Sequence, residues 1–259
     1  MNFSIIGTGN MAHFLIVQLQ AAGHQCVGLW GRNAHAAQQM SVSFAVPLLK
    51  NLHAIPDETA HVCFLAINDG AIPTLMEGIY LQKSILVHCS GASPLQLLEN
   101  HAAHRAVFWP IYSILKTSIS ANKEIPIALE ANDPTTEESI LALAQSISKQ
   151  VFVAQAIQRQ QLHLAAVLVN NFSNHLMSIA QALCIEADVP FNTLHPIMAQ
   201  TFLRAQEENP QTCQTGPAIR GDEATQAQHL SLLEQHPLWA DIYKSLSTSI
   251  RKMYRSDAD

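Results

Sequence analysis

A glycine-rich turn near the start of the chain has the residue types and the spacing of a phosphate-binding loop. The apolar run Phe3–Ile6 predicts a strand, and the residues that follow it in the pattern G-x-G-x-x-A are Gly7, Thr8, Gly9, Asn10, Met11 and Ala12. The first glycine permits a tight turn, the second lets the backbone approach a pyrophosphate, and the alanine lets a helix pack close to the strand. A helix that begins there directs free N–H groups at the anion. The pattern predicts a dinucleotide-binding loop, with a tight turn that holds no ligand as the alternative.

The end of the second apolar run bears on the choice of cofactor. Cys26–Trp30 leads into Arg32 and Asn33, where an NAD site would usually carry an acidic residue for the ribose 2′-hydroxyl. A guanidinium suits a 2′-phosphate instead. We expect both residues to contact the cofactor, and we expect NADP rather than NAD or FAD. A solvated surface arginine is the alternative.

Further loops follow apolar runs in the first half of the chain, and ligands in an open α/β sheet bind at such strand ends. The runs are Val62–Ile67, Ile85–Val87 and Ala106–Phe108. The residues expected to line the cofactor are Ala66, Ile67 and Asn68, and the candidate substrate contacts are His88, Ser90 and Tyr112. For His88, a strand-end histidine bonded to the backbone is the alternative.

A polar stripe lies on a long helical pattern between residues 157 and 185. At about 100° per residue, His163, Asn170 and Asn174 fall within roughly 40° of one another, beside an apolar packing seam. We expect this stripe to line a substrate cleft, with Asn170 and Asn171 orienting the substrate. His163 is the candidate general acid because histidine titrates near neutral pH. A hydrogen-bonded contact between helices is the alternative for the stripe.

A loop rich in glycine and proline, residues 215–222, presents one cation and one anion. Arg220 is a candidate contact for an anionic group of the substrate, with pairing to a local carboxylate as the equal alternative. Asp222 is expected to cap a helix that begins at Glu223.

These candidate residues lie in two parts of the chain whose patterns predict different kinds of domain. Short apolar runs alternate with helical patterns up to Val151–Val153, and Asp133-Pro134 marks the start of a helix that ends near Lys149. We therefore predict an α/β fold, a Rossmann-like doubly wound parallel sheet, as an NADP-binding domain over residues 1–154. Residues 155–259 carry only helical patterns, the later ones near 192–208, 223–234 and 238–254, and are predicted to form an all-α domain.

The composition excludes several classes of protein. Of the 259 residues 48% are apolar and 13% are charged, which is typical of a soluble globular chain. The net charge of −6 and the lack of a basic cluster argue against nucleic-acid binding. No apolar run approaches the roughly 18 residues of a membrane span. The 5 cysteines form no C-x-x-C pair and the histidine pairs form no zinc motif, so we expect a cytoplasmic protein without a metal.

Taken together, the motifs resemble a family of bacterial Rossmann-like proteins whose C-terminal half is a domain of unknown function. The stretches that carry the resemblance are Gly7–Ala12, Leu65–Asp69, His88–Gly91, Ile125–Glu130, His163–Ala166, Asn170–His175 and Thr215–Asp222. Members are labelled NADP oxidoreductases similar to the deazaflavin-dependent type. The wider superfamily includes pyrroline-5-carboxylate reductase, ketopantoate reductase and β-hydroxyacid dehydrogenases, and its helical domains tend to pair, which implies a homodimer.

Two departures qualify the resemblance. The family usually has a Tyr-Pro-Leu-Gln-Thr-Phe-like stretch where this chain has Trp109–Ile114, a change that affects the substrate pocket more than the cofactor site. The hydroxyacid enzymes carry a lysine four residues before an asparagine, whereas Val167 stands four residues before Asn171. A lysine-based mechanism is therefore not expected.

The predicted function is that of an NADP(H)-dependent oxidoreductase. It would transfer a hydride to or from a small carbonyl or imine substrate bound between the two domains. The alternative is a protein that binds or senses NADP without turnover and whose helical domain binds a partner; the missing lysine motivates this second hypothesis.

Overall fold

The computed structural model of the chain describes residues 1–115 and 125–254. By internal contacts the chain divides into two compact units, Met1–Asn171 and Phe172–Asp259. The helix that follows the last strand thus belongs by its contacts to the first unit, whereas the functional boundary at residue 154 stays a prediction.

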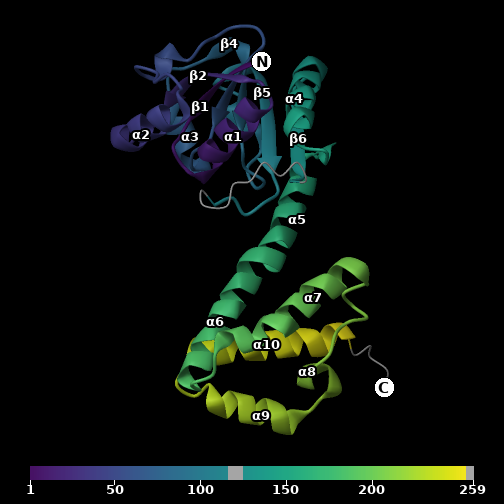
Figure 1. Cartoon of the computed structure of the whole chain (residues 1–259). Helices are drawn as coiled ribbons and strands as arrows, with labels where there is room; N and C mark the ends of the chain where they lie inside the picture. The colour runs from purple at the N-terminus through teal and green to yellow at the C-terminus, as the bar shows by residue number, and fades with distance from the viewer. Residues whose placement is uncertain (116–124, 255–259) are drawn as a thin grey trace. The chain divides into compact units, whose positions relative to one another are not determined.

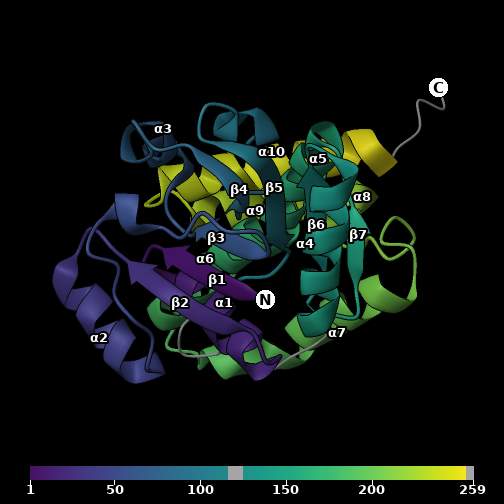
Figure 2. The ribbon, with the colours of Figure 1, turned by 90° about the horizontal axis from the view of Figure 1, so that it is seen from above.

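The first unit is built on a seven-stranded sheet with the order β2-β1-β3-β4-β5-β6-β7 (Figures 1 and 2). The strands are β1 Asn2–Ile6, β2 Gln25–Trp30, β3 His61–Leu65, β4 Leu81–His88, β5 Ala102–Pro110, β6 Ile127–Ala131 and β7 Val151–Val153. β2 lies on one side of β1 and β3 lies on the other, so the direction in which successive strands are added to the sheet reverses at β1. Ligands bind at this position in sheets of this class. The predicted Rossmann-like α/β fold is confirmed.

One strand pair departs from the predicted parallel pattern. β5 and β6 are antiparallel, with Pro110 opposite Ile127 and Ala106 opposite Ala131, whereas β7 is again parallel to β6. β6 therefore begins at the same end of the sheet at which β5 ends. An expectation of parallel strands throughout was wrong for this pair, because an apolar run of strand length carries no information about its direction.

Helices cover both faces of the sheet (Figure 2). Those of the first unit are α1 Asn10–Ala21, α2 Ala34–Phe44, α3 Ile72–Leu75, α4 Pro134–Ile147 and α5 Ala156–Ala166. Successive strand residues point to opposite faces, so Ile5 and Phe64 join a core with α1 and α4, while Ile6 and Leu65 join a second core with α3. These two fully buried layers hold the strand ends rigidly in register.

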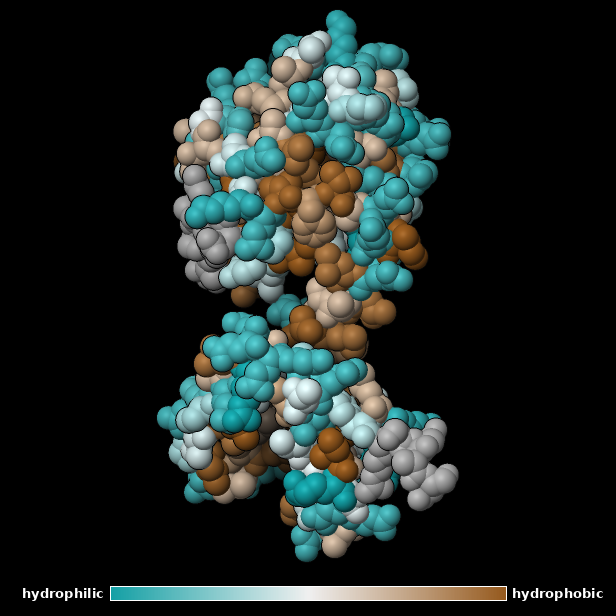
Figure 3. Space-filling view, turned by 90° about the vertical axis from the view of Figure 1, so that its right-hand side faces the viewer, coloured by the Kyte–Doolittle hydropathy of each residue, from teal (hydrophilic) through white to brown (hydrophobic). Residues whose placement is uncertain are grey.

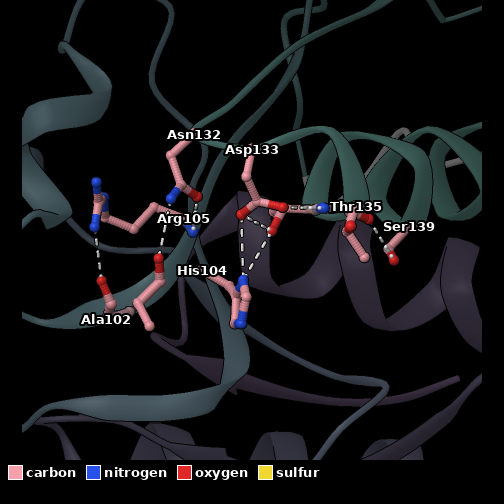
Figure 4. A network of polar contacts seen from close by, with 9 residues as sticks. Ala102, His104, Arg105, Asn132, Asp133, Thr135 and Ser139 are labelled. Carbon is pink, nitrogen blue, oxygen red and sulfur yellow. Dashed lines mark hydrogen bonds and ion pairs between the residues drawn. The ribbon is translucent and has the colours of Figure 1, made fainter.

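The start of α4 is tied to β5 by a network of polar contacts (Figure 4). The carboxylate of Asp133 accepts hydrogen bonds from the backbone N–H and the hydroxyl of Thr136, at 2.9 and 2.6 Å. His104 Nδ1 lies 3.2 Å from the same carboxylate. The backbone N–H of Arg105, the residue after His104, donates a hydrogen bond to Asn132 Oδ1 at 2.7 Å. The predicted helix start at Asp133-Pro134 is confirmed, with the capping side chain also serving to fix the end of β6.

The long helical pattern between residues 157 and 185 is interrupted in its middle. After α5 the chain forms a π-helical segment, Val167–Phe172, and then α6, Ser173–Glu186. A π-helix has more residues per turn than an α-helix, so an angle computed at 100° per residue does not hold across this segment. Such segments occur often at functional sites.

The second unit is entirely helical in its described part. Besides α6 it contains α7 His195–Glu207, α8 Pro217–Arg220, α9 Glu223–Leu232 and α10 Pro237–Tyr254. Asp222 caps α9 by accepting a hydrogen bond from the Thr225 backbone at 3.0 Å, as predicted. The buried apolar side chains of residues 172–254 are only Ala218, Leu233 and Ala240, and neither α6 nor α7 has a buried residue. This unit buries little apolar surface by itself.

Within the described ranges, no helix is both long and apolar enough to cross a membrane.

Candidate functional site

A cavity of about 840 Å³ opens at the carboxyl ends of β1, β2 and β3. Its lining residues are Gly7, Thr8, Gly9, Asn10, Met11, Trp30, Arg32, Asn33, Ala66, Ile67, Asn68, Asp69, Ala71, Leu75, Cys89, Ser90, Gly91, Trp109 and His163. All residues predicted to contact the cofactor are among them except Ala12. Ala12 is a fully buried residue of the first turn of α1, as its predicted packing role requires.

The backbone of the glycine loop is shaped for close approach. Gly7 has a φ of +134°, and a Cβ built there would lie 2.2 Å from the Ala66 carbonyl oxygen, so only glycine fits. A Cβ at Gly9 would meet nothing within 4 Å, which means that this glycine faces open space. Gly9 is the N-cap of α1 and provides no side-chain cap. The first N–H groups of α1 are thus left for an anion, and the loop fits a bound pyrophosphate.

The two side chains at the end of β2 have different surroundings. Asn33 Oδ1 accepts a hydrogen bond from the Ala36 backbone at 3.0 Å and caps α2. Arg32 is exposed on the cavity wall. Arg32 is the stronger candidate for a 2′-phosphate contact because its guanidinium is charged, whereas Asn33 could offer only neutral amide N–H donors.

His88, a candidate substrate contact, lies in the protein interior rather than on the cavity. Its side chain is fully buried at the end of β4, and its Nδ1 accepts a hydrogen bond from the Ser90 backbone at 3.2 Å. Burial lowers the pKa of His88 to about 4, against the opposing effect of Asp69. A neutral buried imidazole of this kind corresponds to the alternative, a strand-end histidine bonded to the backbone. Ser90 does line the cavity, and its hydroxyl accepts from the Ser93 backbone at 3.1 Å.

A second cavity of about 500 Å³ shares Trp109 and His163 with the first. It is lined by Trp109, Ile111, Tyr112, Ser113, His163, Ala166, Val167, Val169, Asn170 and Asn171. The structure therefore brings the predicted proton donor, both predicted orienting asparagines and Tyr112 around one space. Asn170 and Asn171 both line it from the π-helical segment. Asn174 and Arg220, the remaining candidate substrate contacts, belong to the second unit.

Trp109 forms the wall common to the two cavities. Its ring centroid lies 5.6 Å from that of His163, in an edge-on arrangement, and its side chain is only 7% exposed. A Cβ on Gly91 would lie 2.5 Å from the indole, so the glycine makes room for the tryptophan. Trp109 was not named as a site residue from the sequence. Its place in the stretch that departs from the family pattern could have indicated that it lies at the substrate pocket.

Asp69 is another cavity residue to which no role was assigned from the sequence, although it lies in the stretch Leu65–Asp69. Its carboxylate accepts a hydrogen bond from the Ser93 hydroxyl at 2.7 Å, which joins the loop after β3 to the loop after β4. Across residues 1–115 and 125–254, no three His, Cys, Asp or Glu side chains gather as a metal site would require.

Two family models match the chain. One, described as NADP oxidoreductase coenzyme F420-dependent, covers residues 2–91, and the other, a domain of unknown function (DUF2520), covers residues 125–250. A search of curated proteins found no match.

Solved structures resemble the whole chain. A protein of Bacteroides fragilis described as a “putative NADP oxidoreductase” is 30% identical, with a TM-score of 0.87 over 97% of this chain and 98% of that chain. A 1-pyrroline-5-carboxylate reductase of Streptococcus pyogenes is 15% identical, with a TM-score of 0.62 over 97% and 98%. An imine reductase of Myxococcus stipitatus in complex with NADP+ is 14% identical, with a TM-score of 0.62 over 97% and 93%. The last two likenesses concern the fold alone.

Proposed function

The chain belongs to the family of Rossmann-like oxidoreductases that combine an NADP oxidoreductase domain with DUF2520, and we propose that it is an NADP(H)-dependent reductase of small carbonyl or imine compounds. The observation that carries the proposal is the meeting of two cavities at His163 and Trp109. One contains a loop fitted for a pyrophosphate, and the other contains amide side chains suited to a polar substrate.

In this proposal the first cavity holds the cofactor. The N-terminus of α1 binds the pyrophosphate, Arg32 binds the 2′-phosphate, and the segment from Ala66 to Asn68 lines the ribose and nicotinamide half. When bound there, the nicotinamide supplies or accepts the hydride.

The second cavity holds the substrate. Asn170 and Asn171 donate hydrogen bonds that orient the C=O or C=N group, and Trp109 excludes water from the space between substrate and cofactor. His163 donates a proton to the heteroatom as the carbon receives the hydride, so that the product is an alcohol or an amine. That Asn174 and Arg220 contact the substrate stays a prediction.

Cofactor preference provides the first test. In calorimetric titrations we expect NADPH to bind more tightly than NADH, and Arg32→Ala to weaken NADPH binding about 10- to 100-fold with NADH unchanged, since a charged hydrogen bond contributes about 1.5–3 kcal/mol. Arg204→Ala, an exposed arginine of α7, is the control. Equal weakening of both cofactors would show that Arg32 contacts a part that they share.

Turnover is measured next with cyclic imines, small ketones and a deazaflavin as alternative acceptors from NADPH. Imine or ketone reduction supports the proposal, and transfer to the deazaflavin alone would replace its substrate class. Tight NADPH binding without turnover on any acceptor would favour the alternative, a binding or sensing protein.

We also infer that the protein acts as a homodimer, in the cytoplasm. Helices α6 and α7 have no buried residue, and their side chains Ile185, Ile197 and Leu203 are 72%, 60% and 56% exposed. Hydrophobic side chains also gather on the face of the first unit shown in Figure 3, and the edge strand β7 exposes Phe152 and Val153. A second copy would cover such surfaces.

Light scattering should give twice the 28.4 kDa chain mass, and Ile197→Glu should shift the measured mass toward that of the monomer.

A further inference from the structure

The largest fully buried side chain of the described residues is a charged one, Arg159 on α5. A buried guanidinium is costly unless it is paired. Its Nη2 forms an ion pair with the carboxylate of Glu130 on β6, and the same atom donates a hydrogen bond to the Ser93 carbonyl at 3.2 Å. Arg159 thus joins the first turn of α5 to a strand and to the loop after β4.

That loop is part of the cofactor cavity. Its residues Cys89, Ser90 and Gly91 are lining residues, and the Ser93 hydroxyl donates to Asp69, which also lines the cavity. The residue after Arg159 adds a second connection, because Gln160 Nε2 donates to the Ala92 carbonyl at 3.2 Å. The first turn of α5 is therefore fixed against the loop at two successive carbonyls.

His163 follows Arg159 by four positions on α5, about one helical turn, so the two side chains lie on the same side of the helix. The ring of His163 lies against Trp109 of β5, the neighbour of β6. A rotation or shift of α5 would therefore change the position of His163 relative to the common wall of both cavities.

We propose that Arg159 is a positioning residue: through Glu130 and Ser93 it sets the rotation of α5, and thereby the place of His163 beside Trp109 and the cofactor loop. The inference rests on the proposed function as far as the proton donation by His163 is concerned. It assigns to Arg159 no contact with substrate or cofactor.

A double variant separates positioning from stability. Arg159→Met alone leaves Glu130 without its partner and should lower the unfolding temperature by several degrees. Arg159→Met with Glu130→Leu replaces the pair by apolar groups, which should restore that temperature because exchange of a buried pair for hydrophobic residues is often neutral. We expect kcat of the double variant to remain about 10- to 100-fold low, with the KM for NADPH within about twofold.

A lysine variant tests the same assignment by rescue. Both contacts of Arg159 are made by one nitrogen, so the single ammonium of Arg159→Lys can occupy its place, and we expect part of kcat to return. Arg105→Met is the matched control, because this half-buried arginine bonds the Ala102 carbonyl and lines neither cavity.

A spectroscopic measurement keeps the test independent of turnover. With Trp30 and Trp239 replaced by phenylalanine, the fluorescence of Trp109 reports its contact with the ring of His163, and His163→Ala in the same background gives the value without that contact. We expect the double variant to move about half of the way from the wild-type value to this value, and Arg159→Lys to move less. If the wild-type and His163→Ala proteins differ in fluorescence but the wild-type protein shows no turnover, the proposed function fails and the assignment of Arg159 is still decided by the fluorescence. Wild-type fluorescence in both Arg159 variants, or wild-type kcat in the double variant, would overturn it.

Discussion

Replacement of His163 by alanine is expected to lower kcat of NADPH-dependent reduction about 100- to 1,000-fold, while the dissociation constant of NADPH stays within about threefold. General acid catalysis by a placed side chain contributes about 10²–10⁴-fold. His163 is the titratable side chain shared by the two cavities, edge-on to Trp109 at 5.6 Å. The hydride acceptor carbon and the proton acceptor atom are neighbours, so the donor has to stand where the two cavities meet.

Steady-state kinetics measure this effect. His163→Gln, which keeps a hydrogen-bonding group but cannot transfer a proton near neutral pH, should resemble His163→Ala. His35→Ala, an exposed histidine of α2 that lines neither cavity, is the control and should leave kcat unchanged. A wild-type rate in His163→Ala would remove this residue from the reaction, and cofactor binding without any turnover in the wild-type chain would favour the sensing alternative.

The fold was predictable to the extent that local patterns determine it. The strand-turn-helix around Gly7, the capped helix after Asp133 and the strand Val151–Val153 each depend on neighbouring residues, and the structure has all of them. The direction of β6 and the π-helical segment after α5 depend on contacts distant in sequence. No local pattern distinguishes an antiparallel edge from a parallel one, or a π-helical turn from an α-helical one.

The candidate site was predictable where a motif determines the backbone and not where packing determines a side chain. The glycine loop and the strand ends gather around one cavity because parallel strands end at one edge. No motif marks Arg159, and Trp109 is marked only by its place in the stretch that departs from the family pattern. The roles of both side chains depend on contacts with Glu130, Ser93 and Gly91, which lie on other elements. His88 is the opposite case, a residue of reactive type that the fold buries.

Acidification from pH 7 to pH 4 is expected to lower the free energy of unfolding by about 6 kcal/mol through two buried histidines. Burial lowers the pKa of both His61 and His88 from 6.5 to about 4, and nearby carboxylates oppose this only in part. Both side chains are essentially inaccessible, at 1% and 0% exposure. His61 Nδ1 lies 3.0 Å from the Ser84 hydroxyl, and His88 Nδ1 accepts the Ser90 backbone, so neither ring faces a carboxylate directly.

The sign of the effect follows from proton binding. Between pH 6.5 and about 4 the unfolded chain binds a proton at each of these histidines and the folded chain does not, so stability is complete above pH 6.5 and decreases toward pH 4. Each group contributes about 1.4 kcal/mol per pH unit, and the pair about 2.7. Since the free energy of unfolding of a domain is about 5–15 kcal/mol, the loss is large enough for acid unfolding near pH 4.

Urea unfolding at a series of pH values measures the slope of stability. His88→Asn keeps an acceptor for the Ser90 N–H but does not titrate, so it should reduce the slope between pH 6 and pH 5 by about half, to roughly 1.4 kcal/mol per pH unit. His35→Asn, at an exposed position of α2, should leave the slope unchanged. Because the slope depends on proton uptake and not on packing, it remains informative even if His88→Asn lowers stability at pH 7.5. An undiminished slope would mean that His88 is protonated in the folded protein, and its ring would then have to face a charged or solvated partner rather than the core.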